Sequence, residues 1–88
     1  FNLPVAAAKT AAVAAALGLR ADDEAALLET ASQWCRNLGA EMRLSALGAT
    51  QANLPAWASE AHAIRRLMDN NPRDMSVDEV LAVYSAAF

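Results

Sequence analysis

The stretch Leu67–Phe88, "LMDNNPRDMSVDEVLAVYSAAF", decides how the chain ends. A proline pushes the residue before it out of the α region, so "NNPR", residues 70–73, predicts a turn that stops a preceding helix. Ser76 and Glu79 form a Ser-x-x-Glu capping box, which predicts the start of a final helix. The apolar residues of that helix recur at helical spacing and are expected to face inward. They are Val77, Val80, Leu81, Tyr84 and Phe88.

Three more long helices are predicted upstream. The first runs from about Pro4 to Leu17, because proline suits a first turn and Gly18 suits a stop. The second runs over residues 22–38, where negative charge at the start favours the helix dipole and a glycine follows the end. The acidic residues at that start are Asp22, Asp23 and Glu24, and the glycine is Gly39.

A short helical turn and a third long helix fill the middle of the chain. The segment "MRLSALG" predicts a single helical turn ended by Gly48. The segment "NLPAWASEAHAIRRLMDN", residues 53–70, predicts the third long helix, with Asn53 as N-cap and Pro55 in the first turn. The fold class is therefore all-α: a small antiparallel bundle of about four helices plus one short helical turn, in one domain over residues 1–88.

Each long helix has a face that is expected to pack against a neighbour. On the first helix this face is almost smooth, because alanine dominates it. The faces comprise Val5, Ala8, Lys9, Ala12, Val13, Ala16 and Leu17; then Leu27, Ala31, Trp34, Cys35 and Leu38; then Leu54, Trp57, Ala61, Ile64 and Met68. A chain of 88 residues with few aromatic side chains builds only a modest core.

Composition excludes several classes of function. The net charge is −3, and the only concentration of basic residues is Arg65, Arg66 and Arg73, which argues against a nucleic-acid binder. A single cysteine rules out an internal disulfide and fits a reducing compartment. The longest apolar run, residues 11–19, is too short to span a bilayer. We expect a soluble, cytoplasmic chain that contacts neither nucleic acid nor membrane.

The residue types that carry chemistry are scarce. Cys35 lies in an apolar stripe, so we expect a small buried hydrophobe and no nucleophile. His62 has no Cys, Asp or Glu partners at ligand spacing, so we expect an ordinary surface or boundary residue. No glycine-rich loop follows a strand, and no nucleophile, base and orienting group occur together. We predict no catalytic, cofactor-binding or metal-binding residue in this chain.

Four features taken in order resemble one family. They are "FN" followed by a helix containing lysine and "LG"; a long helix with an acidic start; "L-x-x-LG" followed by "NLPAWA"; and "AIRRLMDNNPRDMSVDEVLAVYSAAF". Together they resemble the C-terminal helical part of the iron-dependent (group III) alcohol dehydrogenases. The resemblance covers essentially the whole chain, and Asn71-Pro72-Arg73 before the capped helix is its most specific part.

The resemblance implies a larger enzyme. Members of the family have an N-terminal dinucleotide-binding domain and an all-helical C-terminal domain, with the active site between them. An aspartate and three histidines hold Fe²⁺, or sometimes zinc, which polarises the alcohol or aldehyde oxygen while hydride moves to or from NAD(P). Those ligands and the cofactor loop precede "FN" in the family, so the chain alone is expected to be inactive and to bind no cofactor.

Two further expectations follow from the resemblance. Leu67, Met68 and Asn71 are expected to line the cleft of such an enzyme. The start at Phe1 suggests that the chain is processed, truncated or partial, and its expected partners are then the missing N-terminal domain and metal-ligand helices, or a second copy through an exposed apolar face. The alternative is a free-standing helical module that binds a partner helix in an alanine-rich groove.

Overall fold

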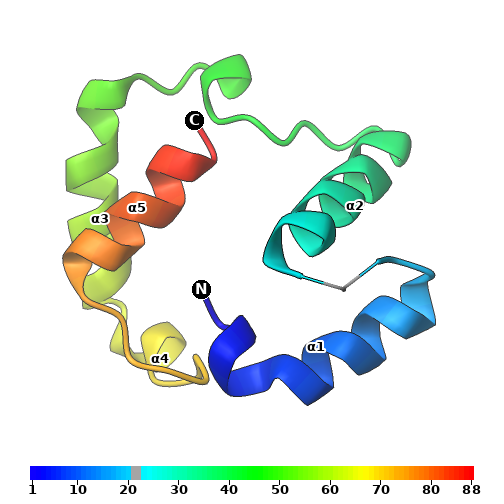
Figure 1. Ribbon diagram of the computed structural model, residues 1–88. Helices are drawn as coiled ribbons and strands as arrows, with labels where there is room; N and C mark the ends of the chain where they lie inside the picture. The colour runs from blue at the N-terminus through cyan, green and yellow to red at the C-terminus, as the bar shows by residue number, and fades with distance from the viewer. Residues whose placement is uncertain (21–22) are drawn as a thin grey trace. The chain divides into compact units, whose positions relative to one another are not determined.

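The computed structural model describes residues 1–20 and 23–88. These residues form helices and turns without any strand, which confirms the all-α prediction. The elements in chain order are α1 (Leu3–Leu17), α2 (Glu24–Asn37), the 3₁₀ turns η1 (Ser45–Leu47) and η2 (Gln51–Asn53), α3 (Leu54–Ala63), α4 (Arg65–Met68) and α5 (Val77–Ala86) (Figure 1). Residues 1–42 and 43–88 form two compact units.

Helix α1 ends where the sequence predicts. Gly18 has φ +67°, a left-handed conformation that glycine adopts without steric cost. This conformation lets the N–H of Leu19 reach back to the Ala14 carbonyl oxygen at 2.8 Å, and the N–H of Gly18 reach that of Ala15 at 3.2 Å. Two otherwise unpaired carbonyls at the end of the helix are satisfied in this way.

The inner face of α1 differs from the predicted one. Ala14 is only 2% exposed and, with half-buried Ala6 and Thr10, forms a row at a spacing of four residues. The predicted face is exposed along its length, including Val13 at 60%. Because alanine occurs on every side of this helix, hydrophobicity does not distinguish the faces.

Helix α2 starts at a side-chain cap. Asp23 is the N-cap, and its Oδ1 accepts a hydrogen bond from the Ala26 N–H at 2.8 Å. The predicted start at Asp22 lies outside the described residues. Cys35 is half-buried, so the prediction of a buried residue is wrong. Trp34 and Leu38, from the same predicted stripe, are exposed by 39% and 67%.

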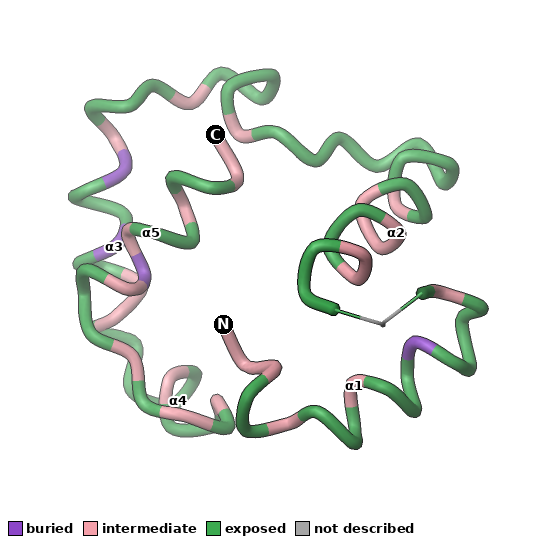
Figure 2. The backbone as a smooth tube through the Cα atoms, viewed as in Figure 1, coloured by how far each residue is buried: buried purple, intermediate pink, exposed green. Residues whose placement is uncertain are grey.

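The second unit has its core between α3 and α5. Leu54 and Ala58 on α3 are 4% and 0% exposed, and Val80 on α5 is 6% exposed (Figure 2). The small side chain of Ala58 allows the two helices to approach closely. The prediction that Val77 faces inward is wrong, because it is 38% exposed beside the helix start.

The end of α5 is tied to the short turn η1. The backbone N–H of Leu44 donates to the Ala87 carbonyl oxygen at 2.9 Å, and the Ser45 hydroxyl donates to the Phe88 carbonyl oxygen at 2.5 Å. Gly48, with φ +89°, ends η1 as predicted. The chain therefore closes the second unit by returning α5 to the segment that precedes α3.

The prediction of one long helix over residues 53–70 is wrong, because the helix breaks at Ile64. At φ −79° and ψ 73°, Ile64 leaves the helical region, and α4 then begins. The Ile64 carbonyl oxygen accepts hydrogen bonds from the N–H groups of Leu67 and Met68, at 2.9 and 3.2 Å. This break exposes the Ile64 side chain by 43%, although the predicted stripe placed it inside.

Helix α3 starts where the sequence predicts, with Asn53 at its N-cap position, although the cap itself differs. Asn53 makes no side-chain cap for α3. Its Oδ1 turns back and accepts hydrogen bonds from the N–H and hydroxyl of Thr50, at 2.8 and 2.7 Å. Asn53 thereby stabilises η2, and Pro55 remains in the first turn of α3 as predicted.

Candidate functional site

The three residues expected to line a cleft lie on one short segment of the second unit. Leu67 and Met68 end α4, and Asn71 follows in the turn. Leu67 is 51% exposed, whereas Met68 and Asn71 are half-buried. The N–H of Asn71 donates to the Met68 carbonyl oxygen at 2.9 Å. The segment therefore presents one exposed apolar side chain beside a turn that is fixed by backbone contacts.

The turn after α4 is held by polar side chains. The Asn71 amide Nδ2 donates to the Arg73 carbonyl oxygen at 2.5 Å. The Arg73 guanidinium donates to Glu79 Oε1 at 2.8 Å, with each side chain a little over one-third exposed. This ion pair links the turn to the first turn of α5. Sequence reasoning missed it, because Arg73 lies in the turn outside α5 and its separation from Glu79 follows no helical spacing.

Glu79 also makes the predicted capping box. Its Oε2 accepts a hydrogen bond from the Ser76 N–H at 2.9 Å, and the Glu79 N–H donates to the Ser76 hydroxyl oxygen at 3.2 Å. The Ser76 N–H bond is the main reason that the pKa of Glu79 lies below its ordinary value, and the Ser76 hydroxyl and the Arg73 guanidinium lower it further, against an opposing desolvation. Glu79 is therefore held as a carboxylate.

The predicted concentration of arginines is largely engaged with carboxylates. Arg65 lies 2.5 Å from Asp69 and 3.8 Å from Asp74, and Arg73 is paired with Glu79. The Arg65 pairs are well exposed, so each contributes little to stability. Only the Arg73–Glu79 pair joins the turn to a helix start, and the Arg65 pairs lie on the exposed surface.

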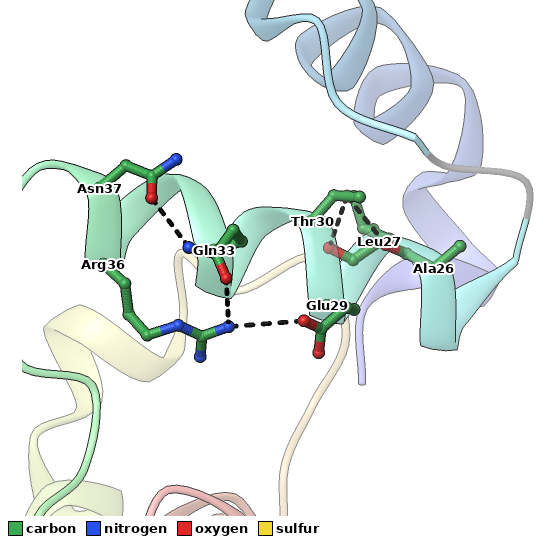
Figure 3. A network of polar contacts seen from close by, with 7 residues as sticks. All are labelled: Ala26, Leu27, Glu29, Thr30, Gln33, Arg36 and Asn37. Carbon is green, nitrogen blue, oxygen red and sulfur yellow. Dashed lines mark hydrogen bonds and ion pairs between the residues drawn. The ribbon is translucent and has the colours of Figure 1, made fainter.

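The exposed side of α2 carries a polar network in the first unit. Arg36 donates to Gln33 at 3.1 Å and lies 3.4 Å from Glu29, and Gln33 donates to Asn37 at 2.8 Å (Figure 3). Thr30 donates to the Ala26 carbonyl oxygen within the same helix, at 2.8 Å. These contacts follow ordinary helical spacings and stabilise the helix surface.

The first unit contains open apolar hollows. One of about 420 Å³ lies between α1 and α2, with Val13, Leu17 and Leu27 in its lining. A second, of about 330 Å³, shares Leu27 and extends to Phe1. Their linings are mainly apolar and suit apolar side chains, although Lys9 lines the first hollow and Glu24 the second.

Metal ligands are not gathered in the part of the chain that the structure describes. Across residues 1–20 and 23–88, no group of three or more His, Cys, Asp or Glu side chains could hold a metal ion. His62 is half-buried in the last turn of α3. The described residues therefore do not fit a metal centre of the iron-dependent enzymes. Nor is any described helix long and apolar enough to cross a membrane.

The described residues form two all-helical units that gather no set of side chains able to hold a metal ion. The chain matches the "Fe-containing alcohol dehydrogenase family, C-terminal" over residues 1–88. It belongs to this family, as the motifs around Asn71-Pro72-Arg73 predict.

A curated relative supports the same relationship. The chain is 47% identical over 45 residues to the sulfoacetaldehyde reductase of Bilophila wadsworthia (strain 3_1_6). The aligned part is 51% of this chain and 12% of the relative, so the chain spans a small fraction of that protein's length. No solved structure matches the chain.

Proposed function

We propose that this chain is the C-terminal helical part of an oxidoreductase that transfers hydride between an alcohol or aldehyde and NAD(P). The family match over residues 1–88 carries the proposal. The name of the relative, a reductase of an aldehyde, supports this substrate class. Cytoplasmic location is part of the same proposal.

We place the metal and nucleotide sites of the parent enzyme outside the described residues. One cysteine and one histidine lie in different units, and the described carboxylates do not converge into a ligand set. The described residues also contain no strand followed by a glycine-rich loop, the arrangement that holds a dinucleotide phosphate. The helical chain by itself is then inactive, and its contribution is to complete the domain and its cleft.

Exposed apolar side chains support packing on the rest of such a protein. Leu28, Leu38 and Leu47 are 67%, 67% and 70% exposed. Among the described residues, no side chain larger than alanine is fully buried. A domain with so small a core gains stability when further helices cover its apolar faces. Residues 1–88 are then one part of a larger helical domain, with Leu67, Met68 and Asn71 at the cleft.

The test is hydride transfer by the full-length protein that contains this chain. We expect Fe²⁺- or Zn²⁺-dependent oxidation of NADH or NADPH with a panel of short aldehydes that includes sulfoacetaldehyde, followed at 340 nm, a standard wavelength for the reduced nicotinamide. The 88-residue chain is the control and is expected to give no turnover. A full-length protein that is loaded with metal and folded, yet inactive with every aldehyde and alcohol, would contradict the proposal.

A further inference from the structure

The carboxylate of Glu79 joins two local structures of the second unit. One oxygen, Oε2, caps α5 through the Ser76 N–H at 2.9 Å. The other, Oε1, holds the Arg73 guanidinium at 2.8 Å. An ordinary capping box needs only the first of these contacts. The second contact fixes the preceding turn to the start of α5.

The connection continues back to α4. The Arg73 carbonyl oxygen accepts the Asn71 side-chain amide, and the Asn71 N–H donates to the Met68 carbonyl oxygen at 2.9 Å. Consecutive hydrogen bonds therefore run from the last residue of α4, through the turn, to Glu79. These contacts connect the end of α4 to the start of α5.

Helix α4 needs such an anchor. It has only four residues, Arg65–Met68, and so short a helix is not stable without external contacts. The residue before it, Ile64, is non-helical and 43% exposed, so packing on that side is limited. The Ile64 carbonyl oxygen holds the N–H groups of Leu67 and Met68 on one side, and the turn after α4 constrains the other end.

We propose that Arg73 and Glu79 are positioning residues that hold Leu67 and Met68 in place at the substrate cleft. The proposal rests on the proposed function, because it takes the α4 end to be part of the cleft surface. Neither residue contacts substrate. Their ion pair orients the turn, and the turn orients the apolar side chains that the substrate meets.

The experiment compares three variants of the full-length protein. Arg73→Gln removes the ion pair, and Arg73→Lys keeps the positive charge without the guanidinium fork. Arg36→Gln is the matched control, because it removes a similar ion pair, Arg36–Glu29 at 3.4 Å, from the surface of α2. Circular dichroism shows that each variant is folded. Amide hydrogen exchange over residues 64–80 and steady-state kinetics with an aldehyde substrate are the two readouts.

We expect Arg73→Gln to speed amide exchange at Leu67–Asn71 by about tenfold, as local opening becomes easier. The same variant is expected to raise the KM for the aldehyde by about five- to tenfold, with kcat and the KM for the nucleotide within about twofold. Arg73→Lys is expected to recover part of both effects, and Arg36→Gln to change neither.

The possible outcomes distinguish failure of the positioning role from failure of the proposed function. Unchanged exchange at Leu67–Asn71 in folded Arg73→Gln protein would show that the ion pair anchors nothing, whatever the enzyme's activity. Faster exchange with an unchanged aldehyde KM would overturn the positioning role at the cleft. Wild-type protein without hydride transfer would instead overturn the proposed function, and the exchange readout would still show whether the anchor exists.

Discussion

The indole of Trp57 on α3 meets the ring of Tyr84 on α5 edge to face, with ring centroids 6.5 Å apart and planes inclined at 62°. This geometry suits the aromatic quadrupole, in which the positive edge of one ring meets the negative face of the other. The pair lies beside the buried residues Leu54, Ala58 and Val80 in sequence and joins the two helices that form the core.

A double-mutant cycle measures this contact. Trp57 is 37% exposed, so we expect Trp57→Ala to cost about 2 kcal/mol, less than the ~3–5 kcal/mol of a fully buried tryptophan. The coupling energy between Trp57→Ala and Tyr84→Ala is expected to be about 0.5–1.5 kcal/mol. Urea unfolding of the dilute chain gives both values, and strictly additive costs would mean that the rings do not interact.

Ends of helices were the features most readily predicted from the sequence. Gly18 and Gly48 end helical segments with positive φ, and Ser76 with Glu79 begins α5. Each of these signals depends on chemistry within a few residues, such as a missing Cβ or a side-chain acceptor at fixed spacing. Local chemistry of this kind is visible in sequence.

The features that the sequence did not predict lack such a local signal. No glycine or proline marks the helix break at Ile64 in the sequence. The buried side of α1 is marked by Ala14, which sequence does not distinguish from the alanines around it. The Arg73–Glu79 pair exists only once the turn has brought its residues together. The cleft position of Leu67, Met68 and Asn71 stays a prediction, because the other side of a cleft would come from elsewhere.

The pH dependence of stability provides a prediction about Glu79. Its pKa in the folded chain lies below the ordinary value of 4.5, so the unfolded chain binds the proton more readily. The stabilisation is therefore present above the unfolded pKa and is lost as the pH falls through the folded pKa. We expect the thermal midpoint to fall on acidification from about pH 6 to about pH 3, and Glu79→Gln to reduce that fall.

The control for this titration is Glu60→Gln, at an exposed position of α3. This variant is expected to follow the wild-type curve more closely than Glu79→Gln does. Because glutamine can also serve at the third position of a capping box, Glu79→Gln removes the charge without removing that acceptor. Identical pH profiles for wild type and Glu79→Gln would contradict the assignment.

The N-cap geometry of α5 predicts that removing the Ser76 hydroxyl lowers the stability of the chain. Ser76 Oγ accepts the Glu79 N–H at 3.2 Å, and alanine at this position leaves that donor without its protein acceptor. We expect Ser76→Ala to lower the free energy of unfolding by about 1 kcal/mol. Ser59→Ala, at an exposed position inside α3, is the matched control and is expected to be near neutral. Equal effects of the two substitutions would argue against the cap.

Replacing Pro72, in the turn after α4, is expected to change stability and leave substrate binding unchanged. Pro72 is exposed, and its ring restricts the unfolded chain at a position already shaped as a turn. We expect Pro72→Ala to cost about 0.5–1 kcal/mol, measured by urea unfolding. In the full-length protein the nucleotide and aldehyde KM values are expected to stay within about twofold of wild type. Unchanged stability with altered KM values would reverse this assignment.

The exposed leucines predict how the 88-residue chain behaves in solution. Leu38 and Leu47 are 67% and 70% exposed, and a chain with such apolar surface and a small core tends to associate. We expect the chain to sediment as species larger than a monomer and to bind an apolar dye. Leu38→Gln and Leu47→Gln are expected to reduce both signals, whereas Ala25→Gln, at an exposed position of α2, leaves them unchanged. A monomeric, dye-silent chain that unfolds in one sharp transition would instead favour a free-standing interaction module, because its apolar surface would then need no missing helices to cover it.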